Sequence, residues 1–206
     1  MSVFQEIAAV GVVPVIKLDD PSDAAPLARA LKAGGVPVAE VTFRTSAAEE
    51  SIRRIASEVE GVLLGAGTVL TAEQAERAHR ARARFIVSPG FDADVVRTSL
   101  ALGMDVLPGC ATPTEIMAAI KLGLKAVKFF PASVYGGLAG IKALAAAFPG
   151  LGFVPTGGVG PKNLAEFLGF SPILACGGSW MVNTKDLDET TRLSAEARDI
   201  VRSVRG

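Results

Sequence analysis

The feature of this 206-residue sequence that most restricts its fold is a regular alternation of short apolar runs and amphipathic stretches. Eight runs rich in Val, Ile, Phe and Gly recur about 20–27 residues apart, the length that one strand, one helix and two short loops need. Strands separated by helices pair in parallel, and eight such units allow the sheet to close without an exposed edge. We therefore predict an α/β fold, a single (β/α)8 TIM-barrel domain over residues 1–206. The eight runs are residues 11–17, 36–44, 61–68, 83–90, 104–109, 125–132, 152–158 and 172–179.

Helix-start signals between these runs support the count. A Thr or Ser precedes a Glu or Gln by a few residues in 45–51, 71–76 and 112–117, as in a capping box. In residues 19–26, Asp and Ser adjoin prolines, which also favours a helix start. We expect an N-terminal helix and a long amphipathic closing helix over residues 184–205. A doubly wound open sheet is the main alternative, but its Gly-rich fingerprint is absent near the first strand.

Composition argues against several classes of function. The 21 basic and 21 acidic side chains give a formal net charge of zero, so we expect no nucleic-acid partner. No stretch approaches the roughly 20 apolar residues of a membrane span, and no basic leader begins the chain, so we expect a soluble cytoplasmic protein with no membrane partner. Cys110 and Cys176 are expected to be buried thiols in a reducing compartment. The single histidine, His79, lies in a polar stretch and cannot supply a multi-histidine zinc site.

One lysine, Lys128, lies inside the apolar run "LKAVKFFPAS" of residues 124–133. An ammonium group without a partner is costly to bury, and lysine is rarely fully buried. Lys128 could reach the surface from an edge strand, or its neutral amine could be a nucleophile. Strand alternation places it on one face with Ala126 and Phe130.

The strand predicted over residues 36–44 separates polar from apolar side chains. Because helices cover the outside of a barrel, its apolar set should face outward and its polar set inward. An inward Glu40 and Arg44 suit an active site at the carboxyl ends of the strands, and a structural Glu–Arg pair is the alternative. If Lys128 also faces inward, the three side chains share one cavity. The inward set is Val38, Glu40, Thr42 and Arg44, and the outward set is Ala39, Val41 and Phe43.

Two further features lie at strand ends. Lys17 ends the first strand, but the sequence "LDD" follows it, which favours an exposed, ion-paired lysine over a substrate contact. The last two strands end in "PTGGVGPKN" and "ACGGSW". Glycine pairs followed by a helix start let backbone N–H groups approach an anion, and the loops after strands seven and eight commonly bind phosphate in this fold. We predict a phosphate site there, with two plain tight turns as the alternative.

These motifs together resemble those of a known family. "PVI", "EVTFRT", "GAGTVL", "VSPG", "LPG", "KFFPA", "PTGGV" and "GGSWMV" follow one another across roughly residues 8–182. Their order is similar to that in the class I family of 2-keto-3-deoxy-6-phosphogluconate (KDPG) and 4-hydroxy-2-oxoglutarate (KHG) aldolases. The resemblance implies a lyase without metal or cofactor on a (β/α)8 barrel, usually a homotrimer. The implied reaction cleaves KDPG to pyruvate and glyceraldehyde 3-phosphate in the Entner–Doudoroff pathway.

The resemblance also implies roles for single residues. Lys128 would form a Schiff base with the substrate, and Glu40 would transfer protons. Arg44 and Thr68 would bind the pyruvate carboxylate. The remaining implied contacts are the pocket walls Pro89 and Phe130, the stereochemical determinant Thr156, and the phosphate cradle that Thr156 shares with Gly157, Gly158, Gly178 and Ser179.

Departures from the family pattern and alternative activities stay open. "EVTFRT" favours the gluconate-type enzymes over the phosphogalactonate aldolases, which usually have an "EVPLNS"-like stretch. Phe43 replaces a Leu that is common in relatives. "SVYGGL" replaces an "AEANGGV"-type loop, and Tyr135 in this loop could alter the fit of the aldehyde end of the substrate, so the range of substrates stays open. One alternative is KHG aldolase activity, giving pyruvate and glyoxylate, and another is oxaloacetate decarboxylation through the same imine. A phosphosugar epimerase or isomerase would share the phosphate cradle but would not need Lys128.

Overall fold

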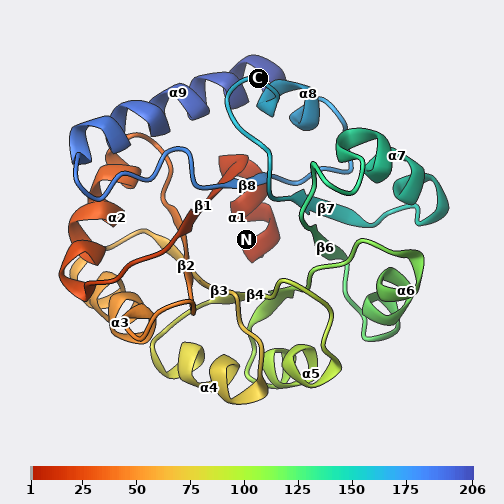
Figure 1. Cartoon of the computed structure of the whole chain (residues 1–206), viewed down its shortest axis with the longest axis horizontal. Coiled ribbons are helices and arrows are strands. Elements are labelled where there is room, and N and C mark those ends of the chain that lie inside the picture. Colours follow the sequence, from red (N-terminus) through yellow and green to blue (C-terminus); the bar gives the residue numbers. More distant parts are fainter. Residues whose placement is uncertain (1) are drawn as a thin grey trace.

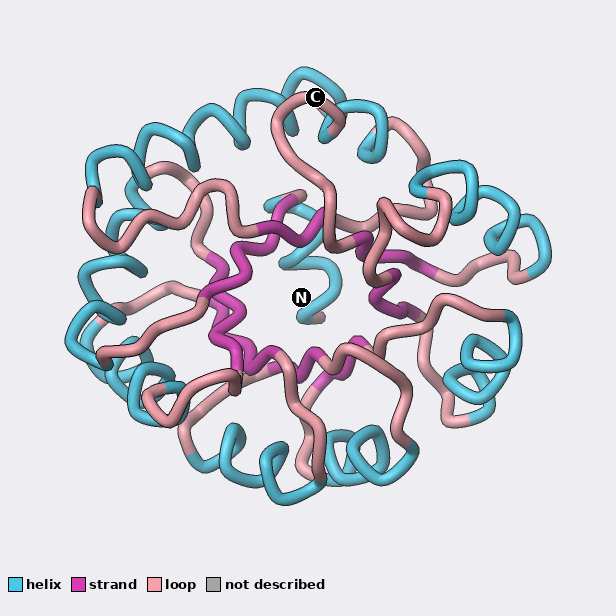
Figure 2. Tube along the Cα trace, in the orientation of Figure 1, coloured by secondary structure: helices cyan, strands magenta, loops and turns pink. Residues whose placement is uncertain are grey.

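The computed structural model describes residues 2–206, and in this range eight strands with parallel pairing are arranged in a ring inside a layer of helices (Figures 1 and 2). Every strand lies within one of the eight predicted runs and is shorter than it, because the glycines and prolines at the ends of those runs lie in loops. The strands are β1 (Val12–Ile16), β2 (Val38–Thr42), β3 (Leu63–Gly67), β4 (Phe85–Val87), β5 (Asp105–Leu107), β6 (Ala126–Phe129), β7 (Gly152–Pro155) and β8 (Cys176–Gly178).

Helices connect the strands and cover the outside of the ring (Figure 1). The predicted N-terminal and closing helices are both present, as α1 and α9. The helices are α1 (Val3–Val10), α2 (Ala24–Ala33), α3 (Ala48–Glu58), α4 (Ala72–Arg80), α5 (Ala93–Ala101), α6 (Pro113–Lys121), α7 (Gly137–Ala147), α8 (Leu164–Leu168) and α9 (Leu187–Arg205), with a short 3₁₀ helix at Pro21–Asp23.

The strands form two hydrogen-bonded ladders. One is a curled six-stranded sheet in the order β5-β4-β3-β2-β1-β8, and the other pairs β6 with β7. Single parallel bridges join the ladders, from Gly109 to Lys128 and from Thr156 to Gly177. At the first of these, the Lys128 amide donates to the Pro108 carbonyl at 3.0 Å, and the Cys110 amide donates to the Lys128 carbonyl at 2.8 Å. Lys128 is therefore held by backbone hydrogen bonds at a seam between the two ladders.

Strand alternation divides the apolar side chains into two cores. Ala39, Val41, Val127 and Phe129 belong to the outer core, between the strands and the helices. Val38 and Ala126 belong to an inner core. This confirms that alternate residues of β2 and β6 face opposite sides, as the sequence predicted. The inner core also contains Val13, Leu63, Phe85, Val87, Leu107, Val154 and Ala175.

Helix α1 lies across the centre of the ring, where the N-terminus is marked in Figure 1. Its buried residues Val3 and Ile7 join the inner core. Ser2 and Gln5 form a capping box at its start, and Gly11 ends it in the left-handed conformation with φ +78°. Helix α1 therefore packs into the end of the ring opposite the carboxyl ends of the strands.

The predicted helix starts are confirmed in part. Thr71 caps α4, and Thr112 with Glu115 forms a complete capping box on α6. The predicted cap within residues 45–51 is wrong: α3 begins at Ala48 without a side-chain cap, because the Thr45 hydroxyl donates to the Leu18 carbonyl instead. Asp20 caps the 3₁₀ helix that precedes α2.

Candidate active site

Lys128, the next-to-last residue of β6, and Glu40, in the middle of β2, face each other inside the ring. The Lys128 side chain is 8% exposed and that of Glu40 is 3% exposed, and Nζ lies 3.6 Å from Oε1. Lys128 therefore does not extend to the surface from an edge strand, and both side chains share one buried site. The Lys128 ammonium also lies 5.0 Å from the centre of the Phe130 ring, a cation–π distance.

Burial dominates the electrostatics of Glu40. Desolvation raises the pKa of its carboxyl group, whereas the charges of Lys128 and, more weakly, Arg44 act to lower it. Within residues 2–206, Oε1 has no hydrogen-bond partner, since 3.6 Å to Nζ is an ion-pair distance. A buried carboxyl group with a raised pKa and an unused oxygen is suited to accept or donate a proton.

The space for the Glu40 side chain comes from a glycine that the sequence analysis did not single out. Gly67 pairs with Thr42 across β2 and β3. A Cβ atom at Gly67 would lie only 2.3 Å from Glu40 Oε1 and 2.8 Å from its Cγ. The "GAGT" motif therefore leaves the side chain of Glu40 room to lie over β3. Two inward glycines on one strand are the signal that could have revealed this.

Arg44 is exposed and lies just beyond the end of β2. Its Nε donates to the Thr42 hydroxyl at 3.1 Å. Thr68, the other residue implied in carboxylate binding, directly follows β3 and has φ +56°. A left-handed backbone is unfavourable for a β-branched residue, and such strain is often found at functional sites. Arg44 and Thr68 thus follow the carboxyl ends of two paired strands, β2, which carries Glu40, and its neighbour β3.

The two predicted pocket walls also lie at this end. Phe130 directly follows β6, beside Lys128. Pro89 lies in the loop after β4, and its carbonyl packs so closely on Gly109 that a Cβ atom there would be 2.1 Å away. Gly109 in turn forms the bridge to Lys128. Pro89 is thereby connected to the lysine through one intervening residue.

Thr156 lies at the second seam between the ladders. It is 6% exposed, its amide donates to the Phe129 carbonyl at 2.9 Å, and it pairs with Gly177 of β8. A Cβ atom at Gly177 would lie 2.3 Å from the Thr156 hydroxyl oxygen, so this glycine gives the hydroxyl its space. Thr156 alternates with the inward Val154 and therefore faces the interior of the ring.

The predicted phosphate cradle is only partly as expected. Gly157 and Gly158 have φ +92° and +78°, and Gly178 and Ser179 follow at the end of β8. A helix follows each glycine pair only after a loop, since α8 begins at Leu164 and α9 at Leu187. Asn163 instead holds the first loop, accepting from the Gly160 amide and donating to the Gly158 carbonyl, both at 2.9 Å. Anion binding there would depend on loop amides, without a helix dipole.

Lys17 and Tyr135 lie away from the buried pair. Lys17 is about half exposed and forms an ion pair with Asp19 at 2.8 Å, as predicted from the sequence. Tyr135 is 52% exposed, and its ring packs edge-on against Phe129 with the ring centres 6.4 Å apart. Neither residue makes a hydrogen bond or ion pair with Lys128 or Glu40 in the part of the chain that the structure describes.

Other titratable groups are placed as the composition predicted. Cys110 and Cys176 are buried, and burial raises the pKa of each thiol to about 12. His79 is exposed on α4. Among residues 2–206, no group of three or more His, Cys, Asp or Glu residues could hold a metal ion. None of the helices in the same range is long and apolar enough to cross a membrane.

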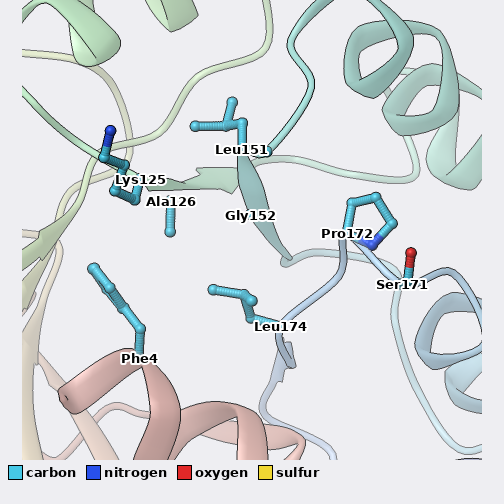
Figure 3. A pocket seen from close by; sticks show the side chains of 9 residues that line it. Phe4, Lys125, Ala126, Leu151, Gly152, Ser171, Pro172 and Leu174 are labelled. Carbon is cyan, nitrogen blue, oxygen red and sulfur yellow. The ribbon is translucent and has the colours of Figure 1, made fainter.

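A separate cavity of about 450 Å³ lies at the opposite end of the ring (Figure 3). It opens beside the amino ends of β6 and β7, between Phe4 of α1, Lys125 and Leu174. Its lining is mainly apolar and contains none of the residues that the sequence analysis assigned to the site. Since the buried lysine and carboxyl group are at the other end, we place the chemistry there.

Comparisons with known proteins identify the family. The family model "KDPG and KHG aldolase" matches residues 3–194. A 2-dehydro-3-deoxy-phosphogluconate aldolase of Treponema pallidum is 48% identical over 206 residues, covering 98% of both chains.

Two solved structures are also similar. The KDPG aldolase of Zymomonas mobilis in complex with 3-phosphoglycerate is 41% identical, with a TM-score of 0.90 and 95% coverage of both chains. A KDPG aldolase of Legionella pneumophila, with pyruvate captured as a covalent carbinolamine intermediate, is 34% identical, with a TM-score of 0.86 and 98% coverage of both chains. On this similarity over nearly its whole length, the chain belongs to the KDPG and KHG aldolase family.

Proposed function

We propose that this protein is a class I aldolase that cleaves KDPG to pyruvate and glyceraldehyde 3-phosphate. The observation that carries the proposal is the buried pair of Lys128 and Glu40, 3.6 Å apart inside the ring. An amine in a buried site can attack a ketone, and a neighbouring carboxyl group can move the protons that this attack requires. The aldolases at 34–48% identity support the substrate class.

The proposed reaction uses the residues in a definite order. The neutral amine of Lys128 attacks the C2 ketone, and loss of water gives a protonated imine. That cation accepts the electron pair of the C3–C4 bond, while Glu40 removes the proton of the C4 hydroxyl and the aldehyde product leaves. The enamine left on Lys128 takes up a proton at C3, and hydrolysis of the imine releases pyruvate. Glu40 can supply the proton that the enamine takes up at C3.

The other site residues are proposed to hold the two ends of the substrate. Arg44 and Thr68 would bind the carboxylate beside C2, with Pro89 and Phe130 as walls. Thr156, Gly157, Gly158, Gly178 and Ser179 would contact the aldehyde end and its phosphate. We propose no metal or organic cofactor, since the imine at Lys128 supplies the electron sink. On the same resemblance we infer that the two ladders act as one closed (β/α)8 domain and that the protein is a homotrimer.

Trapping with borohydride tests the central step. We expect pyruvate with sodium borohydride to inactivate the enzyme irreversibly and to add one reduced pyruvate group at Lys128, because borohydride reduces an imine to a stable amine. Peptide mass spectrometry locates the adduct, and incubation with EDTA is the control that should leave activity unchanged. An adduct at Lys17, or none at all, contradicts the assignment. A phosphosugar epimerase or isomerase would form no adduct.

KHG aldolase activity is a second candidate for the same site. The matching family model names both KDPG and KHG aldolases, and both substrates would form the same imine. A coupled assay of pyruvate release from KDPG and from 4-hydroxy-2-oxoglutarate measures the preference. A kcat/KM higher on the unphosphorylated substrate would make the second activity the main one.

A further inference from the structure

The hydroxyl group of Thr42 makes two hydrogen bonds that link the end of β1 to the mouth of the site. Thr42 is 1% exposed and lies on the inward face of β2, two residues after Glu40. Its Oγ1 donates to the carbonyl of Ile16 at 2.8 Å, and it accepts a hydrogen bond from Nε of Arg44 at 3.1 Å. A hydroxyl has a single proton. Because that proton goes to Ile16, a lone pair is left to face Arg44.

The second bond constrains an otherwise free guanidinium group. Arg44 is exposed, and in the described residues 2–206 its two terminal nitrogens have no protein hydrogen-bond or ion-pair partner. Several rotatable bonds would let such a side chain sample many positions, and ordering it on binding would reduce affinity. With Nε fixed, the terminal nitrogens remain available as a pair of donors, the arrangement that suits a carboxylate.

We propose that Thr42 is a positioning residue that fixes Arg44 for binding the carboxylate of the 2-keto acid. This inference rests on the proposed function, in which Arg44 holds that carboxylate. The Thr42 hydroxyl does not touch the substrate. It acts by presenting the guanidinium in one orientation, anchored through Ile16 to the adjacent strand. The hydroxyl group of the neighbouring Thr45 donates to the Leu18 carbonyl and makes no hydrogen bond with Arg44. Of these two threonines, Thr42 is therefore the one that orients the guanidinium group.

The test compares two variants at position 42 and keeps a third in reserve. Thr42→Val keeps the shape of the side chain but removes both hydrogen bonds, whereas Thr42→Ser keeps the hydroxyl. We expect Thr42→Val to raise the KM for KDPG by about tenfold, the range for one charge-assisted hydrogen bond, with kcat within about twofold. Thr42→Ser should stay within about twofold of the wild type in both constants. If Thr42→Val does not fold, Thr42→Cys, whose thiol accepts hydrogen bonds weakly, takes its place.

Two further measurements separate positioning from a plain structural role. In the background of Arg44→Ala, Thr42→Val should change KM by less than about twofold, because the residue it acts through is gone. The pyruvate concentration that half-saturates borohydride inactivation should rise in Thr42→Val. The half-saturating concentration of acetone, a ketone without a carboxylate, should not change. A loss of similar size with acetone, or in the Arg44→Ala background, overturns the inference.

The outcomes also distinguish this inference from the proposed function. If pyruvate and borohydride do not inactivate the wild type, the imine mechanism fails and the role of Thr42 fails with it. If the wild type is inactivated but Thr42→Val keeps the wild-type half-saturation for pyruvate, only the role of Thr42 is overturned. A folded Thr42→Ser that binds pyruvate as weakly as Thr42→Val would show that the methyl group matters, and would also overturn it.

Discussion

At the scale of single residues, Glu40 has the most unusual surroundings. It is buried, one of its oxygens lacks a hydrogen-bond partner in the described residues, and it forms an ion pair with the amine proposed to react. Its room over β3 depends on Gly67. A carboxyl group in such a position is costly for folding when ionised, which is typical of a group kept for chemistry.

We expect Glu40→Gln to retain imine formation and to lose turnover. The amide cannot exchange protons, so kcat for KDPG cleavage should fall about 10²–10⁴-fold, whereas borohydride trapping with pyruvate should still label Lys128. Steady-state kinetics and mass spectrometry of the trapped protein measure the two effects. Full turnover in this variant would make Glu40 a structural residue.

The raised pKa of Glu40 also predicts how this variant changes stability with pH. Burial moves the pKa above its ordinary value of 4.5, so the folded state holds its proton more tightly than the unfolded state. The wild type should therefore lose stability relative to Glu40→Gln as the pH rises from below 4.5 through the raised pKa. Urea unfolding of both proteins at about pH 4 and about pH 8 gives the difference. A difference that does not change with pH contradicts the shift.

At the scale of elements, the loops that follow β7 and β8 form the proposed phosphate end. Gly158 has φ +78°, and a Cβ atom there would lie 2.4 Å from the Cβ of Ser133. A larger residue at Gly158 would strain this loop whether or not phosphate binds, so that change cannot test the site cleanly. Ser179 is exposed beside the end of β8 and can lose its hydroxyl without such a clash.

Ser179→Ala is expected to affect the phosphorylated substrate selectively. Loss of a hydrogen bond to a charged group should lower kcat/KM for KDPG by about tenfold or more, because binding energy from the remote phosphate helps to position the reacting carbons. The value for 4-hydroxy-2-oxoglutarate, which has no phosphate, should stay within about twofold. Ser57→Ala, on the exposed face of α3, is the matched control. Equal losses on both substrates would place the phosphate site elsewhere.

At the scale of the whole molecule, arginine side chains of the last helix, α9, form hydrogen bonds with the first helix, α1. Arg205, in the last turn of α9, donates to the carbonyls of Ala8 in α1 at 3.2 Å and of Leu174 before β8 at 2.7 Å. A further bond joins it to the Ile173 carbonyl at 2.6 Å. Arg198 bonds the carbonyls at the end of α1. These arginines donate hydrogen bonds to carbonyl groups, including those at the end of α1 that have no partner within the helix, and they keep α1 packed against one end of the ring.

Arg205→Ala should therefore lower the stability of the protein more than the same substitution at the nearby Arg202. Three carbonyls lose their donor, and we expect the free energy of unfolding to fall by about 1–2 kcal/mol. Arg202→Ala removes only an exposed ion pair with Asp199 and should stay within about 0.5 kcal/mol of the wild type. Urea unfolding of the two variants measures both effects. Equal stability of the two would show that the contacts of Arg205 contribute nothing.

The sequence by itself determined the order of strands and helices, their number, and the face on which each side chain of β2 and β6 lies. These features depend on local spacing: a period of two in strands and about 3.6 in helices. It also predicted the exposed ion pair of Lys17 and the caps of α4 and α6, whose partners are neighbours in the chain.

Only the tertiary structure decided what lies between segments distant in the sequence. The 3.6 Å separation of Lys128 and Glu40, the space at Gly67 and the bond from Arg44 to Thr42 depend on strand register and on how closely the strands pack. Thr45 shows the same limit: its local signal predicted a helix cap, but the Leu18 carbonyl, brought near by β1, is its partner. Local patterns fix which face a residue takes, and packing fixes what it meets there.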